Sequence, residues 1–420
     1  MYKYIILIFT ILSLNSNGIA AQEKVYRTDV YREDIKSLQV KVAGEMISSP
    51  YIELNGDKRI EITFDALHYT NERFVYSIIH CDADWKQSVL IPIEYMKGFQ
   101  QAPLDERSYS INTTTHYANY RLSLPNNDVQ LIVSGNYAVQ VFSENKPNDA
   151  IFTACFSVVE PLVEIEPFIK GNTDIDFNKE HQQIEFNIQL KNIQIAYPQN
   201  ELKILVYQNN NLNDIRTDFQ PFSITGNQIQ YQHVRNLIFT AGNEFRRIEF
   251  LTHRTNGMGV ERTAFYDPFY HITLYRDTPR ANKTYLYDQD QNGRFFVHCR
   301  DCQNPNTEAD YYVVHFALAT TPFLNGQVYL SGEFTYYQLD EKYRMEYNIE
   351  TGCYEKAILL KLGLYNYQYV VVDNNTQQSA SVTPTEGAYF DTENEYAISV
   401  YYRPAAARYD RLIGIKTAKN

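Results

Sequence analysis

The sequence predicts an all-β protein of tandem immunoglobulin- or fibronectin-like β-sandwich domains, with little helix. Its 420 residues include 36 Tyr and 23 Phe, and aromatic residues fit the half-buried surface of a pleated sheet. Short stretches of alternating apolar and polar residues recur between Gly, Pro and Asn turns, which is the pattern of a sandwich. Windows rich in Ala or Leu, which are typical of helices, are scarce.

The chain is too long for one hydrophobic core. We therefore divide it at turns and changes of composition. The expected parts are a signal peptide (1–20), an N-terminal sandwich (21–160), a second sandwich (161–280), a third sandwich (281–403) and a C-terminal tail (404–420).

The signal peptide is predicted from three features in order. Lys3 supplies a charge, residues 4–14 form an apolar run, and Gly18 and Ala20 are small residues of the kind a signal peptidase reads. No later stretch approaches the roughly 18 consecutive apolar residues of a membrane-spanning helix. We expect an exported, water-soluble protein without direct membrane insertion.

Each sandwich is assigned from its own strand-like runs. In the first, Ser134 to Tyr137 resembles a turn into a penultimate strand, where a Tyr hydroxyl bonds back to the corner backbone. The third resembles the small sandwich modules that bind starch and glycogen, although it lacks their paired Trp residues. The runs are 58–67, 74–81, 120–124, 136–142 and 151–159; then 184–190, 202–206, 245–251 and 271–275; then 328–334 and 362–369.

The most informative stretch covers residues 74–99. A run of strand-forming residues ends in an acidic turn, and Trp85, the only tryptophan of the chain, follows that turn. Trp85 either packs on the edge of the sandwich, as buried Trp residues commonly do, or contacts a partner. We name Trp85, Tyr95 and Phe99 as candidate partner-binding residues.

The sequence gives little support for catalysis or for a cofactor. Asp82 and Asp84 stand two apart, but exposed carboxylates after a strand are typical of a solvated turn. His80, His253 and His298 occupy strand-like positions, where we expect partly buried structural histidines. The formal net charge of -12 disfavours nucleic acid as a partner. We expect no enzyme activity, no cofactor and no bound metal.

One segment, residues 288–293, matches the first half of a calcium-binding loop. Position twelve of such a loop is a bidentate carboxylate, and here it is Cys299. We therefore interpret Asn292 and Gly293 as a hairpin turn between strands at 285–287 and 294–298.

Five cysteines leave at least one thiol unpaired within the monomer. Cys299 and Cys302 have the spacing of a redox or zinc half-site, but no second pair completes four zinc ligands. A local disulfide or two free thiols is favoured there. A bridge between Cys81 and Cys155 across the sandwich is disfavoured, because Cys155 alternates with Thr153 and Ser157 on the polar face of its run.

Several motifs together resemble one known family. They include Ile79 to Trp85, the turn at 134–137, Tyr266-Asp267-Pro268, Asp290 to Gly293 and the terminal segments 392–396, 400–403 and 408–414. In this order they are similar to the plug proteins of the Bacteroidetes type IX secretion system, over nearly the whole chain beyond residue 20. Cys155 departs from the pattern, because a basic residue is expected near that position.

The resemblance implies a non-enzymatic periplasmic protein at the inner face of the outer membrane. Such a protein occludes the periplasmic opening of the outer-membrane translocon barrel when no substrate is in transit. An exported glycan-binding protein, using Phe334 and Tyr336 of the third sandwich, is the alternative.

Overall fold

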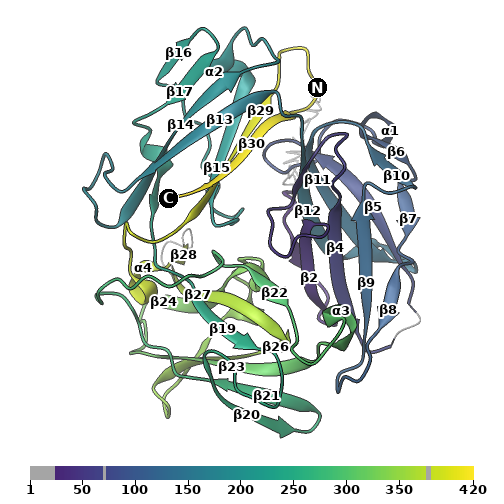
Figure 1. The fold of residues 1–420 in the computed structure, drawn as a ribbon, viewed down its shortest axis with the longest axis vertical. Coiled ribbons are helices and arrows are strands. Elements are labelled where there is room, and N and C mark those ends of the chain that lie inside the picture. The colour runs from purple at the N-terminus through teal and green to yellow at the C-terminus, as the bar shows by residue number, and fades with distance from the viewer. Residues whose placement is uncertain (1–23, 70–71, 375–379) are drawn as a thin grey trace, which may run out of the picture.

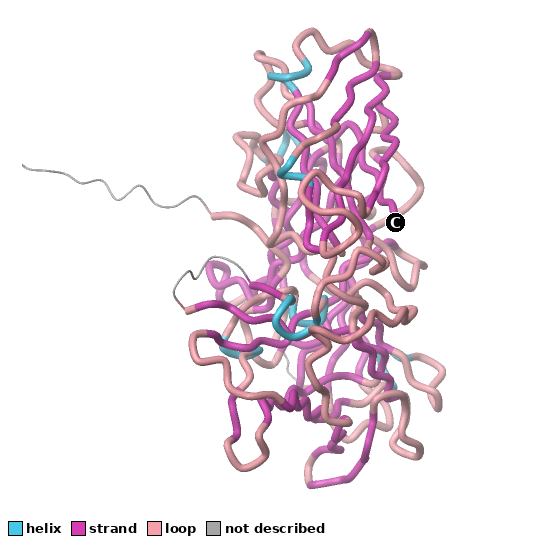
Figure 2. Tube along the Cα trace, turned by 90° about the vertical axis from the view of Figure 1, so that its left-hand side faces the viewer, coloured by secondary structure: helices cyan, strands magenta, loops and turns pink. Residues whose placement is uncertain are grey.

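The computed structural model describes residues 24–69, 72–374 and 380–420. It consists of three β-sandwiches grouped around a common centre (Figure 1). The strands dominate the trace, and the helices are single turns (Figure 2). The all-β sandwich prediction is confirmed. The expected signal peptide, 1–20, lies outside the described residues.

The first sandwich packs two main sheets face to face, and a strand pair and one helical turn lie beside them. One sheet runs in the order β1 (Asp29–Val30), β12 (Lys146–Val159), β11 (Gly135–Ser143), β5 (Phe74–Cys81) and β7 (Gln101–Pro103), and β3 (Tyr51–Glu53) also pairs with β12. The other runs β2 (Ile35–Val42), β4 (Ile60–Leu67), β9 (Tyr117–Leu124) and β8 (Arg107–Tyr109). The remaining elements are α1 (Pro92–Tyr95), β6 (Met96–Gly98) and β10 (Val129–Leu131).

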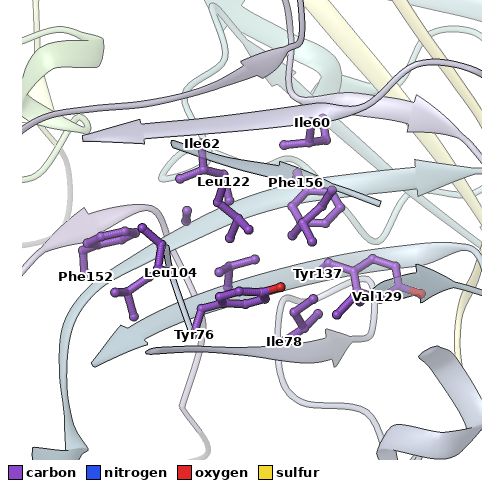
Figure 3. Packing of buried hydrophobic residues seen from close by; sticks show 14 of the residues in the cluster. Ile60, Ile62, Tyr76, Ile78, Leu104, Leu122, Val129, Tyr137, Phe152 and Phe156 are labelled. Carbon is purple, nitrogen blue, oxygen red and sulfur yellow. The ribbon is translucent and has the colours of Figure 1, made fainter. Parts of the chain in front are cut away.

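Alternating side chains of both sheets fill the core between them. Ile60 and Ile62 of β4 face Phe156 of β12 and Tyr137 of β11 (Figure 3), as the period of two in a strand requires. The Tyr137 hydroxyl donates a 2.7 Å hydrogen bond to the carbonyl of Val133. This bond confirms the corner predicted from residues 134–137.

The second sandwich is closed by the end of the chain. Tyr396, Ile398 and Val400 of β29 (Glu395–Tyr402) and Ile413 of β30 (Arg411–Lys419) lie in its core. Residues 404–420 were expected to form a tail. That expectation is wrong, because most of this segment forms the strand β30, which pairs with β29 along its whole length. Its first sheet runs in the order β13 (Val163–Lys170), β14 (His181–Leu190), β17 (Gln228–Tyr231) and β16 (Ser223–Thr225), and β18 (Ile238–Thr240) also pairs with β14. Its second sheet runs in the order β15 (Leu202–Gln208), β29 and β30. The helical turn α2 (Pro198–Glu201) connects the two sheets between β14 and β15, and η1 (Arg235–Leu237) connects β17 to β18 within the first sheet.

The third sandwich is inserted between β18 and β29 of the second. Residues 245–251 and 271–275 were assigned to the second sandwich, but their strands pair within the third. Alternation predicts that a segment is a strand and does not identify its sheet. One sheet contains β19 (Arg246–Phe250), β27 (Gly363–Asp373) and β22 (Phe295–Val297), with β24 (Gly326–Ser331) and β28 (Ala380–Ser381) on β27; the other runs β20 (Val260–Tyr266), β21 (Phe269–Leu274), β23 (Tyr311–Ala319), β26 (Cys353–Lys361) and β25 (Glu346–Asn348). Short helical turns complete it: α3 (Pro305–Glu308), η2 (Glu333–Thr335), η3 (Glu341–Tyr343) and α4 (Thr383–Glu386).

The predicted hairpin at Asn292 and Gly293 is not formed. Residues 285–287 are not a strand, and β22 pairs with β27. The turn itself exists, with φ of 52° and 83° at the two positions. A Cβ on Gly293 would lie 2.4 Å from the hydroxyl of Tyr337 and 2.8 Å from the ring of Phe245, so close packing within the third sandwich requires a glycine at this turn.

A buried ion pair joins the first and third sandwiches. Lys361 Nζ of β26 lies 2.6 Å from Asp65 Oδ2 of β4, and both side chains are almost fully buried. The same carboxylate accepts hydrogen bonds from the Tyr311 hydroxyl (2.6 Å) and from Asn119 Nδ2 (2.7 Å). Lys361 Nζ also donates to the carbonyl of Asn306 (2.7 Å). Both charges are therefore satisfied without water.

A second buried carboxylate joins the first and second sandwiches. Asp410, which precedes β30, is fully buried. It accepts hydrogen bonds from the Ala83 backbone (3.0 Å) and from Lys203 Nζ (2.9 Å). Its own N–H donates to Asp82 (3.0 Å), which also pairs with Arg403 (3.2 Å). The acidic turn after β5 thus anchors the sandwich that the chain's last strands complete.

Replacing Lys361 by Met is expected to destabilise the protein by about 3 to 5 kcal/mol, because it leaves Asp65 buried without its counter-charge. The measurement is urea unfolding followed by fluorescence. Lys58, whose ion pair with Glu45 is exposed, provides the control: Lys58→Met should leave the unfolding midpoint almost unchanged, because solvent screens exposed ion pairs. Equal effects of the two substitutions would contradict the role assigned to the buried pair.

Candidate interaction surface

The segment after β5 is held against the sheet by a dense set of backbone bonds. Trp85 has a left-handed φ of 61° and only 4% exposure. Its carbonyl accepts the N–H of Tyr26, and its own N–H donates to the carbonyl of Asp82. The indole packs in a cluster with Cys81, Ala138 and Cys155 of the sheet, and Leu212 and Ile215 of the second sandwich flank this cluster.

The next turn, α1, is fixed from both sides. Glu94 accepts the backbone N–H of Ile91 (2.9 Å) and pairs with Arg408 (2.5 Å). Arg408 comes from the loop between β29 and β30, and it also donates to the carbonyl of Val89 (3.1 Å). The Tyr95 hydroxyl donates to the carbonyl of Ile78 (2.8 Å) beneath it. The second sandwich therefore helps to set the conformation of this segment.

Four large apolar side chains project from this fixed backbone. Val89 is 61% exposed, Ile91 58%, Ile93 77% and Phe99 67%. Leu90 and Tyr95 between them are buried, so apolar residues alternate between the core and solvent. We call residues 89–99 the apolar segment. Because its backbone is already ordered, contact with a partner through it would cost little conformational entropy.

The three residues predicted to bind a partner lie in different environments. Trp85 and Tyr95 are each 4% exposed, and Phe99 alone presents its ring to solvent. Trp85 packs on the sandwich, which was one of its two interpretations. Val89, Ile91 and Ile93 were missed, although their spacing in a strand-like run next to Pro92 was a signal that one face is unburied.

His80 is a structural residue, as expected. Its Nδ1 lies 2.8 Å from the Ser88 hydroxyl, and its Nε2 lies 3.2 Å from the Ser134 carbonyl. Burial lowers the pKa of His80 to about 4. A Cβ at position 135 would lie 2.4 Å from Nε2, so Gly135 leaves the room that the ring occupies. His253 and His298 are exposed, contrary to expectation.

The carboxylates of the acidic turn do not form an acid–base pair. Asp82 is bound to the backbone of Asp410 and to Arg403, and Asp84 is exposed and lies 3.4 Å from Lys86. Across the described ranges, no three His, Cys, Asp or Glu side chains are gathered as metal ligands would be.

The cysteines follow the favoured interpretations. Cys299 and Cys302 form a disulfide. Cys81, Cys155 and Cys353 are free and buried. Cys81 and Cys155 lie in the same sheet, on β5 and β12, with β11 between them, so a bridge between sheets is geometrically impossible.

The residues named for glycan binding are not displayed to solvent. Phe334 is 7% exposed and packs against Phe316 and Tyr365 in the core of the third sandwich. Tyr336 is half-buried, and its hydroxyl points to the carbonyl of Leu38 in the first sandwich (3.5 Å). Neither ring offers the open stacking face that a sugar requires.

Comparison with known proteins agrees with the resemblance found in the sequence. The family model for the first domain of the type 9 secretion system plug protein matches residues 35–160. Residues 35–160, which make up most of the first sandwich, therefore belong to the type IX secretion plug family. The protein is thus associated with type IX secretion.

Among solved structures, a hypothetical protein from Parabacteroides merdae is similar to this plug-family protein. The two are 56% identical, with a TM-score of 0.93 over 95% of this chain and 100% of the other. Dimeric latent PorU from Porphyromonas gingivalis is 8% identical, and the match covers 92% of this chain and 34% of the PorU chain. Its TM-score of 0.13 carries no argument. No curated protein matches. None of the helices in the described ranges has the length and apolar character to cross a membrane.

Replacing Trp85 by Ala is expected to lower the stability of this plug-family protein by about 3 to 5 kcal/mol, because a large buried side chain leaves a cavity. Thermal unfolding measures the effect. A variant that melts like the unmodified protein but no longer associates with its partner would show instead that the indole acts at an interface.

His80 is expected to make stability depend on pH. Its pKa in the folded state, about 4, is below the ordinary value of about 6.5, so the fold favours the neutral ring. The stabilisation is present above pH 6.5 and is lost as the pH falls toward 4. Between pH 7.5 and pH 5 the loss should be about 2 kcal/mol. Urea unfolding at the two pH values measures it, and His80→Gln should remove this part of the pH dependence.

Proposed function

We propose that this protein is a non-enzymatic plug that occludes the periplasmic opening of the outer-membrane translocon of the type IX secretion system when no substrate is in transit. It would lie in the periplasm, at the inner face of the outer membrane. The observation that carries the proposal is the match of residues 35–160 to the first domain of the plug proteins.

The architecture supports this role. A body that closes a wide pore must keep its shape under contact, and sandwiches joined only by flexible linkers would move independently. Here the buried pair of Lys361 and Asp65 joins the first and third sandwiches. Asp410 joins the first and second, and the third is inserted into the second through two connections. The three sandwiches therefore form one body.

The apolar segment is the surface that we propose contacts the translocon. Its four exposed side chains are held by a backbone that both the first and the second sandwich fix. Such preorganised apolar contacts suit an interface that must form and release. Phe99, the aromatic residue among the four, remains the predicted contact residue.

The test is an affinity pull-down of the tagged protein from solubilised envelope, followed by mass spectrometry for the translocon barrel. Ile91→Asp combined with Ile93→Asp should reduce recovery of the barrel by at least about tenfold, since each charge would have to be buried in the contact. Leu324→Asp is the matched control, because Leu324 is 92% exposed and lies in the third sandwich. Recovery of the protein alone, with the translocon intact in the lysate, would reject the proposal.

Occlusion is separated from mere association by a permeability measurement. Cells without the plug should admit a large hydrophilic fluorescent probe through an idle translocon, and cells with the plug should exclude it. Equal uptake in both strains, with the barrel still recovered in the pull-down, would show that the protein binds without closing the pore.

A further inference from the structure

β20 forms an outer edge of the third sandwich. It pairs with β21 on one side, and it is the end strand of its five-stranded sheet. In the fold it lies at the far end of the third sandwich, away from the other two (Figure 1). An end strand carries main-chain groups that bond only to solvent or to another chain.

The register identifies which residues carry those groups. Tyr266 and Phe269 pair across the two-residue turn of Asp267 and Pro268, so their main-chain groups bond to each other. Hydrogen-bonded and non-bonded pairs alternate in an antiparallel ladder. Thr263 and Phe265 therefore direct their N–H and C=O groups to the open side. Within the described part of the chain, no backbone group lies there as their partner.

Three other long edge strands of the molecule, β13, β15 and β30, are protected. β13 contains Pro167, which cannot donate to a further strand. On β15, Val206 exchanges two backbone hydrogen bonds with Arg216. On β30, the carbonyls of Leu412 and Ile413 accept the N–H groups of residues 160 and 162. On β20 the Asn256 side chain covers the start of the edge, because its amide donates to the Glu261 carbonyl (2.9 Å) and its oxygen accepts the Thr263 hydroxyl (3.1 Å). The main-chain groups of Thr263 and Phe265 have no comparable backbone cover among the described residues.

Two aromatic side chains stand at the end of β20 that adjoins the turn. Phe265 is 49% exposed and Tyr266 is 54% exposed. Phe265 lies edge-on to Tyr270 at 5.0 Å, and Tyr266 lies edge-on to His271 at 5.2 Å. The rings are thus ordered on both faces of the hairpin. A strand laid along β20 would find main-chain partners at the edge and an aromatic surface on each face.

We propose that β20 binds an extended polypeptide segment by β-strand addition, with apolar residues at alternate positions of the segment lying on Phe265 and Tyr266. A short segment suits this edge better than a second copy of the chain does. The bulge between Val260 and Arg262 and the tight turn after Tyr266 limit the open stretch, and two such short edges would bury too little surface for a stable dimer. The proposal does not depend on the plug role.

The probe is a short capped peptide of alternating Val and Thr, observed by NMR on the labelled full-length protein at millimolar peptide concentrations. Binding should shift the amide signals of Thr263 and Phe265 and slow their hydrogen exchange, and the exchange of Ala264 should not change, because its N–H already bonds to β21. The same peptide with N-methyl groups on the residues that face β20 should not bind, because it lacks the donors.

Variants separate main-chain pairing from side-chain contact. Thr263→Pro removes one outward N–H and should weaken binding by about tenfold, and Thr263→Ala, which keeps the N–H, should change it less than about twofold. Circular dichroism and thermal unfolding establish that each variant is folded. If Thr263→Pro does not fold, the N-methylated peptide and the exchange measurement on the unmodified protein still decide the question.

Three outcomes would overturn the proposal. They are the absence of amide shifts on β20, equal binding of the N-methylated peptide, and a concentration-dependent dimer in sedimentation that Thr263→Pro abolishes. The last would show that β20 pairs with its own copy.

Discussion

The pairing of β29 with β15 is the constraint on which the rest of the structure depends. Leu202 lies opposite Tyr402, and the ladder continues to Gln208 opposite Tyr396. The last strands must therefore return to a sandwich that began before the third one. Because the chain enters and leaves the third sandwich at the same end of the second, the third is held by two connections rather than one. This gives the three sandwiches a common centre.

Buried charges then fix the contacts that the connectivity makes available. Lys361 and Asp65 are removed from water only because two hydrogen bonds from Tyr311 and Asn119 and one to a backbone carbonyl satisfy them. A slip between the sandwiches would leave both charges unpaired at low dielectric, which is costly. Apolar contacts tolerate such a slip more readily. The polar joints thus specify one arrangement, and the apolar cores supply most of the stability.

The two exposed surfaces proposed for binding differ in kind. The apolar segment offers side chains on a backbone whose hydrogen bonds are internal. β20 offers the outward main-chain groups of Thr263 and Phe265, which have no backbone partner among the described residues, with aromatic side chains on both faces. The first suits a shaped protein surface, and the second suits an extended chain. A protein associated with secretion can encounter both folded proteins and extended chains. The two surfaces lie on different sandwiches.

Local sequence patterns determined the fold class, most of the strands, the corner at Tyr137 and the family. They also indicated the segment 74–99 as a place of interest, because a strand, a charged turn and a lone Trp adjoin there. These features depend on alternation and turn chemistry, which act over a few residues. Which sheet a strand joins depends on contacts between distant residues. Only the tertiary structure therefore placed β19 to β21 in the third sandwich and β30 in the second. It also buried Trp85 and Tyr95 and left Val89, Ile91 and Ile93 in solvent, because burial depends on which surfaces meet.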